Sequence, residues 1–183
     1  PLVYVRGYGG SGVCWQMTPD GREGFATLML RRGWSNYVVD LPGRGRAGRT
    51  SATTTAKPVA NEMFWFDIWR IGVWPNYNEG VQFPKDWTSL SQFFREMTPD
   101  LSNHQLDVPA LGALAERIGD HILVTHSAGG FPGWMSAMQN AEVKGIVSYE
   151  PGGFVFPEGE VPERIDGLTG GVAGTAVPME RFK

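Results

Sequence analysis

The sequence predicts an α/β fold built on a mostly parallel sheet flanked by helices. Four short apolar runs have the length and composition of strands buried on both faces: residues 2–5, 37–40, 122–125 and 145–149. Three other stretches place apolar residues at helical spacing: residues 25–32, 108–118 and 131–140. Strands that alternate with helices along one chain are typical of a parallel sheet covered on both faces.

Length and composition limit what this chain does. Its 183 residues suffice for one domain, and the 42% of hydrophobic residues exclude a disordered chain. A net charge of −3 gives no field that attracts nucleic acid or an anionic membrane. No apolar run approaches the roughly 20 residues that span a bilayer. The one cysteine, Cys14, excludes an internal disulfide and a cysteine-based metal cluster. We therefore expect no nucleic-acid partner, no membrane span and no metal.

A glycine-rich loop follows the first strand. Gly7, Gly9 and Gly12 match the G-x-G-x-x-G spacing of dinucleotide-binding folds, which requires a helix that opens directly after the glycines. The chain instead runs into a turn signal at residues 18–21, and the acidic candidate for the ribose, Asp40, lies 28 residues past Gly12 rather than about 20. The competing interpretation is a loop whose backbone N–H groups bind a developing oxyanion, because glycine allows close approach of the backbone.

Two segments lie between the second strand and the helix predicted at residues 108–118. Residues 43–49 carry three arginines among small residues, for which we favour a solvated loop over a phosphate or carboxylate site. Residues 50–105 are predicted to be an insertion, because they hold a dense set of aromatic side chains in short pieces broken by prolines. The insertion packs a small core of its own, forms a lid whose aromatic face lines a substrate pocket, or does both. The candidate pocket residues are Gly9, Trp65, Trp69 and Trp74.

Ser127 lies where the strand 122–125 leads into the helix that begins at about residue 131. A serine on a tight strand-to-helix turn is the layout of a nucleophile elbow, which lifts Oγ clear of the sheet and aims the next N–H, that of Ala128, at developing negative charge. The turn requires small neighbours, a requirement that Ala128 and Gly129 meet, while Thr125 occupies the position where glycine is commonest. An ordinary loop with a serine beside two glycines is the competing interpretation.

Glu150 directly follows the strand 145–149. The glycine loop, Ser127 and Glu150 then stand at the carboxyl ends of successive parallel strands, which share one crevice in an open sheet. A serine nucleophile needs a base to take its proton and an acid to orient that base. Glu150 is placed for the role of the acid, with a solvated carboxylate as the alternative.

Five stretches resemble the atypical bacterial (Alcaligenes-type) serine esterase branch of the α/β hydrolases: 6–9 (RGYG), 15–22 (WQMTPDGR), 39–46 (VDLPGRGR), 126–127 (HS) and 148–152 (SYEPG). The resemblance implies one α/β-hydrolase domain over residues 1–183, with 50–105 as its lid. It further implies Ser127 as nucleophile, Glu150 as triad acid, and the N–H groups of Tyr8 and Ala128 as the oxyanion hole. Arg6 departs from the histidine that such enzymes usually have there, and Tyr8-Gly9 from the paired cysteines of the best-known member.

None of the three histidines is expected to serve as the base. His126 adjoins Ser127 in an extended segment, so its side chain projects away from Oγ. His121 begins the strand at the opposite end, and His104 lies just after the insertion. In α/β hydrolases the histidine follows the serine and the acid, after a later strand. We predict no further strand from residue 158 onward, and we expect the base downstream of Lys183, with N- and C-terminal parts of the fold outside the chain.

The predicted function is hydrolysis of a small-molecule carboxylic ester through an acyl-enzyme on Ser127, without a metal or an organic cofactor. Two alternatives stay open: an NAD(P)-binding oxidoreductase that uses Gly7, Gly9 and Gly12, and a catalytically inactive binding module on a hydrolase scaffold. The resemblance favours a secreted or periplasmic protein and allows a homodimer.

Overall fold

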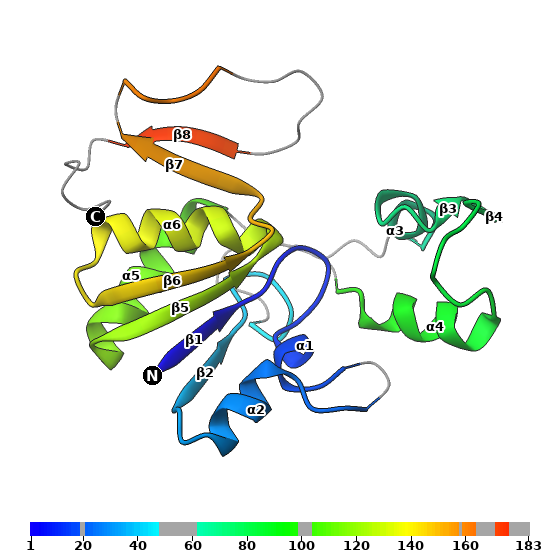
Figure 1. The fold of residues 1–183 in the computed structure, drawn as a ribbon, viewed down its shortest axis with the longest axis horizontal. Coiled ribbons are helices and arrows are strands. Elements are labelled where there is room, and N and C mark those ends of the chain that lie inside the picture. Colours follow the sequence, from blue (N-terminus) through cyan, green and yellow to red (C-terminus); the bar gives the residue numbers. More distant parts are fainter. Residues whose placement is uncertain (19–20, 48–61, 99–103, 158, 164–170, 176–183) are drawn as a thin grey trace.

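The computed structural model in Figure 1 describes residues 1–18, 21–47, 62–98, 104–157, 159–163 and 171–175. Its centre is a four-stranded parallel sheet in the order β2-β1-β5-β6, formed by β1 (Leu2–Val5), β2 (Asn36–Val39), β5 (His121–His126) and β6 (Val143–Tyr149). The four predicted strands are confirmed. The chain runs from β1 outward to β2 on one side and from β5 outward to β6 on the other. The order of the sheet therefore reverses between β1 and β5.

Helices cover both faces of this sheet. α1 (Val13–Gln16) and α2 (Phe25–Arg31) pack on one face, and α5 (Asp107–Ile118) packs on the other with α6 (Gly130–Gln139) against β5 and β6. β1 shows why the apolar run is continuous: Leu2 and Tyr4 join the cluster under α1 and α2, while Val3 and Val5 join the cluster under α5. Successive side chains of a strand point to opposite faces, and here both faces are buried.

β2 differs from the prediction in one respect. It pairs only with β1 among the described strands and lies at the end of the sheet, so Tyr37 keeps 43% of its surface exposed. The helix before it, α2, ends as predicted just before Gly33, which takes a φ of 86° that favours glycine.

The described part of the aromatic segment, residues 62–98, forms a small unit beside the sheet (Figure 1). It consists of α3 (Glu62–Ile68), a hairpin of β3 (Gly72–Val73) and β4 (Asn76–Tyr77), and α4 (Trp87–Glu96). A core cluster of its own holds Phe66, Ile71 and Leu90, with Tyr77, Phe83, Phe93 and Phe94 packed against them. Asp86 is the N-cap of α4, and its carboxylate accepts hydrogen bonds from the Ser89 N–H and hydroxyl at 2.9 and 2.7 Å. Residues 50–61 and 99–103 of the predicted insertion lie outside the described residues.

The prediction of no further strand from residue 158 onward is wrong. β7 (Gly153–Pro157) and β8 (Gly171–Thr175) form a separate two-stranded parallel sheet. The sequence signal is weak because β8 holds two glycines in five residues and each strand needs a distant partner. α6 packs against β7, where Val155 is buried.

Candidate active site

The register of the sheet brings three chain segments level at its carboxyl edge. The pairing of β1 with β5 places Gly7 beside Ser127, and the pairing of β5 with β6 places Ser127 beside Glu150. This edge lies where the order of the sheet reverses. In open α/β sheets, the crevice outside the strand ends at such a point is the usual ligand site.

Ser127 and Glu150 both have a backbone conformation that is rare outside glycine. Their φ angles are 50° and 42°, and Arg70, in the aromatic segment, is the other non-glycine residue with positive φ in the described part of the chain. Each such residue costs on the order of 1–3 kcal/mol, and they concentrate at functional sites. The Gly152 N–H donates to the Ser127 carbonyl at 2.7 Å and so ties the turn after β6 to the turn after β5. Two strained residues therefore stand side by side where the sequence predicts chemistry.

The turn at Ser127 has the strand-to-helix layout of the predicted elbow. β5 ends at His126, a single 3₁₀ turn covers Ser127–Gly129, and α6 follows directly. A methyl group added at Gly129 would lie 2.7 Å from the Arg6 carbonyl oxygen and 3.0 Å from that of Val5. Because these are backbone atoms of β1 and its loop, the close packing of the turn against β1 requires glycine at this position.

The packing around Thr125 explains how the turn tolerates a residue larger than glycine two positions before the serine. Its side chain is fully buried, and its hydroxyl lies 2.7 Å from that of Ser148 on β6. Its methyl group occupies space left by Gly133 on α6, where an added Cβ would come within 2.6 Å of it. The absence of a side chain at Gly133, eight residues further along the chain, thus makes room for the threonine.

The glycine loop after β1 lies directly against the elbow. A Cβ added at Gly7 would be 2.6 Å from the Ser127 Cβ and 3.0 Å from the His126 carbonyl oxygen. Tyr8, whose N–H is a predicted oxyanion donor, follows immediately. Gly9 then turns with a φ of 84°. The loop backbone therefore approaches the serine as an oxyanion-binding loop must.

The contacts of Gly12, at the end of this loop, argue against a dinucleotide site. A one-turn helix, α1, does open directly after Gly12, contrary to the prediction from the turn signal at 18–21. The Gly12 N–H, however, donates to the Asp40 carboxylate at 2.6 Å. A buried carboxylate therefore occupies the helix start where a pyrophosphate would sit, and it repels a phosphate electrostatically.

The aromatic segment reaches the same loop. The Trp65 ring, 6% exposed, lies 5.1 Å from the Tyr8 ring and stacks with Trp69 at 6.4 Å. It also covers Gly9, because a Cβ added there would meet the ring at 2.9 Å. Trp74 instead lines a pocket of about 430 Å³ within the segment, with Glu62, Trp87, Ser91, Phe94 and Arg95. The structure therefore brings Gly9, Trp65 and Trp69 together and leaves Trp74 among different neighbours.

The three histidines lie as follows. His121 is buried at the first position of β5, the end opposite Ser127, and its Nδ1 lies 2.8 Å from the Gly119 carbonyl oxygen. His104 contacts Arg44 and Asp107. His126 is half-buried beside Gly7, and its burial and the Arg6 guanidinium lower its pKa while Glu150 acts in the opposite direction. The net effect favours the neutral form of the His126 imidazole.

The loop 43–47 is not the solvated arginine loop that the sequence favours. Arg44 is buried and forms an ion pair with Asp107, at the start of α5, at 3.0 Å. The Arg46 N–H donates to the Asp40 carboxylate at 2.9 Å. Arg49 lies outside the described residues. In the described ranges, no cluster of three or more His, Cys, Asp or Glu is placed to hold a metal, and no helix is long and apolar enough to cross a membrane.

Sequence reasoning missed two residues at the glycine loop, Asp40 and Thr98. From the sequence, Asp40 is only a candidate ribose ligand, although its place at the end of the strand beside β1 is a usable signal for contact with the loop after β1. Thr98 lies just after α4 and carries no local signal. Both contact the loop backbone directly.

This fold and site define an α/β hydrolase. The model of the alpha/beta hydrolase family matches residues 2–182, and the chain belongs to that family. The chain is 30% identical over 171 residues to a protein named as a probable secreted lipase from Fungal sp. (strain ATCC 74256), covering 86% of this chain and 46% of that protein. It is also similar to the structure of a novel bacterial esterase, with 27% identity, a TM-score of 0.65, and coverage of 87% of this chain and 60% of that one. The chain thus spans about half the length of the lipase and three fifths of the esterase.

Proposed function

We propose that the protein containing this chain is a serine hydrolase that cleaves small-molecule carboxylic esters through an acyl-enzyme on Ser127. One observation carries the proposal: the strained Ser127 stands on a strand-to-helix turn, between the loop after one neighbouring strand, which holds Gly7, and Glu150 directly after the other. The similarity to proteins named as a lipase and an esterase supports it.

In this mechanism the Ser127 Oγ attacks the ester carbonyl carbon and gives up its proton to a histidine. The N–H groups of Tyr8 and Ala128 bind the oxyanion of the tetrahedral intermediate, and Glu150 orients the histidine and stabilises its charged form. The alcohol leaves with the proton, and water then hydrolyses the acyl-enzyme by the same route. None of the three histidines of this chain is the base in this proposal, because His104 and His121 have other contacts and His126 adjoins the serine in the chain.

The aromatic segment 50–105 is the lid of this site in our proposal. Gly9, Trp65 and Trp69 line the acyl side of the substrate, a role supported by the contact of the Trp65 ring with Tyr8 and Gly9. Trp74 lines a different pocket of the segment, so its predicted role in binding the substrate has no comparable support. No metal or organic cofactor is needed for this chemistry. The similarity to a probable secreted lipase supports secretion.

The test uses the full-length protein with p-nitrophenyl acetate and a fluorophosphonate probe. Ser127→Ala should abolish both hydrolysis and labelling, and the labelled peptide of the natural protein should contain Ser127. Glu150→Gln should slow hydrolysis severely. Ser35→Ala, an exposed serine before β2, is the matched control. Hydrolysis that survives Ser127→Ala would refute the proposal, and a folded natural protein that is never labelled would favour an inactive binding module.

A further inference from the structure

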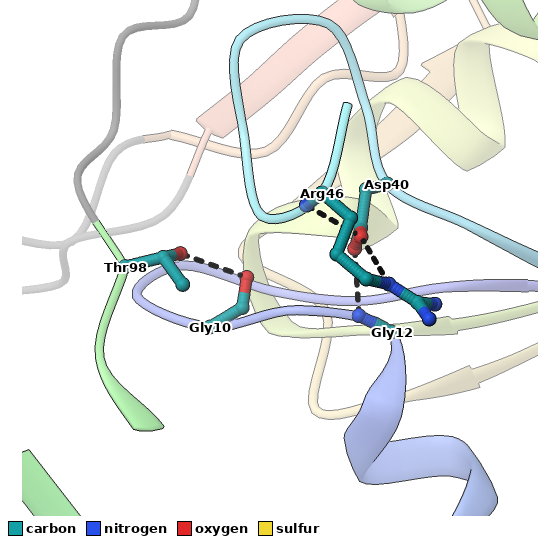
Figure 2. A network of polar contacts seen from close by, with 5 residues as sticks. All are labelled: Gly10, Gly12, Asp40, Arg46 and Thr98. Atoms are coloured by element: carbon teal, nitrogen blue, oxygen red, sulfur yellow. Dashed lines mark hydrogen bonds and ion pairs between the residues drawn. The ribbon is translucent and has the colours of Figure 1, made fainter. Parts of the chain in front are cut away.

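The glycine loop is fixed on one side by the carboxylate of Asp40. Oδ1 accepts the Gly12 N–H at 2.6 Å, and Oδ2 accepts the Arg46 N–H at 2.9 Å, with the Arg46 Nε 3.4 Å away (Figure 2). The Asp40 side chain is only 6% exposed, while that of Arg46 is 55% exposed. The stronger constraint is therefore the pair of backbone N–H bonds, which link the glycine loop to the loop after β2.

The loop is fixed on its other side by Thr98. The Thr98 N–H donates to the Gly9 carbonyl at 3.0 Å. The Thr98 hydroxyl donates to the Gly10 carbonyl at 3.2 Å (Figure 2). Thr98 lies two residues past the end of α4, so this contact comes from the aromatic segment. Three peptide groups of the loop are thus held by two segments that are remote in sequence.

Such anchoring matters because the loop has little conformational preference of its own. Four of the six residues 7–12 are glycine, and glycine loses more backbone entropy on ordering than any other residue. An oxyanion hole works only when its donors are preorganised, and a displacement of about 1 Å can cost on the order of 100-fold in rate. Buried hydrogen bonds to the loop backbone are the kind of support that supplies this order.

We propose that Asp40 and Thr98 are positioning residues, which together hold the glycine loop in the shape that presents the Tyr8 N–H beside Ser127. The inference rests on the proposed function, because it assigns a purpose to the loop only if Tyr8 is an oxyanion donor. It also makes the aromatic segment part of the catalytic geometry, since Thr98 belongs to that segment. Neither side chain touches the reacting atoms.

The test compares Asp40→Asn and Thr98→Val in the full-length protein. Asparagine keeps one acceptor oxygen and loses the other, and valine keeps the shape and the N–H of Thr98 but loses its hydroxyl. Steady-state constants for p-nitrophenyl acetate are referred to active sites titrated by the p-nitrophenol burst, so unfolded protein is not counted. Asp120→Asn is the control, because that carboxylate is 73% exposed and pairs with Lys144 away from the loop.

We expect kcat and the rate of fluorophosphonate labelling to fall roughly 10- to 100-fold in Asp40→Asn and several-fold in Thr98→Val. KM should change little, and Thr98→Ser should recover most of the rate. A merely structural role would lower the melting temperature and leave kcat per titrated site unchanged, which would overturn the inference. Thr98→Val decides the matter if Asp40→Asn fails to fold. Failure of the proposed function is separate, because it would show as activity in Ser127→Ala.

Discussion

The contact between Gly7 and Ser127 allows a prediction whose size follows from the structure. In Gly7→Ala, the new methyl carbon would stand 2.6 Å from the Ser127 Cβ and 3.0 Å from the His126 carbonyl oxygen. Carbon atoms at rest are about 3.5–4.0 Å apart, so the loop and the serine must separate by about 1 Å. The His126 oxygen is a backbone atom and the Ser127 Cβ is bonded directly to the backbone, so neither can move aside as a flexible side-chain end would.

A separation of this size should lower the rate of ester hydrolysis about 100-fold, because it moves the proposed oxyanion donors away from the proposed nucleophile. Overpacking should also destabilise the fold by roughly 1–3 kcal/mol. The assay is the second-order rate of fluorophosphonate labelling at a temperature where circular dichroism shows the variant folded. Gly145→Ala on β6 is the control, since its Cβ would meet its nearest neighbour at an ordinary 3.9 Å. A Gly7→Ala variant that is labelled at the natural rate would refute the reasoning.

Three further predictions concern the scaffold around the site. Asp107→Asn should lower the free energy of unfolding in urea by about 3–5 kcal/mol, because the buried Arg44 loses the charge of Asp107. Lys144→Met, which removes an exposed ion pair, should lower it by less than about 1 kcal/mol. Equal losses in the two variants would contradict this prediction. Gly133→Ala should lower the free energy of unfolding by roughly 1–3 kcal/mol, because the new methyl group would press on the Thr125 methyl group. Adding Thr125→Ser to that variant should recover part of the loss. Strict additivity of the two changes would show that the two side chains do not interact. Burial and Arg6 lower the pKa of His126 below 6.5, so the unfolded chain binds more protons and stability is lost as the pH falls below 6.5. His126→Gln should therefore lose less unfolding free energy than the natural chain between pH 7 and about pH 5.5, and parallel pH profiles would argue against this.

Much of the central sheet was predictable, and the reasons are local. β1 throughout, and β5 over residues 122–124, are apolar because both of their faces are covered, and the helices α2, α5 and α6 show the matching spacing. The elbow at Ser127 was predictable because its strand, its small residues and its helix are contiguous. By contrast, what stabilises α1, β7 and β8 is contact with distant residues, such as the Asp40 carboxylate that accepts the Gly12 N–H at the start of α1.

The loop 43–47 shows why charge patterns mislead. Arginines spaced by glycines indicate a solvated loop, since an isolated buried charge is costly. Here Arg44 is buried because Asp107, which lies 63 residues further along the chain, supplies the opposite charge. The residues near Arg44 in the sequence do not indicate a partner so far along the chain.

The amino-acid sequence by itself determined the α/β class, the order of strands and helices, and the residue types available for chemistry: a serine on a tight turn, a carboxylate after the next strand and a glycine loop after the first. The tertiary structure decided that Gly7, Ser127 and Glu150 stand level at one edge, and that Thr98 holds a loop 88 residues away. The physical reason is range. Backbone propensity and periodicity act over a few neighbouring residues, whereas strand register and buried hydrogen bonds are set by which distant surfaces pack together.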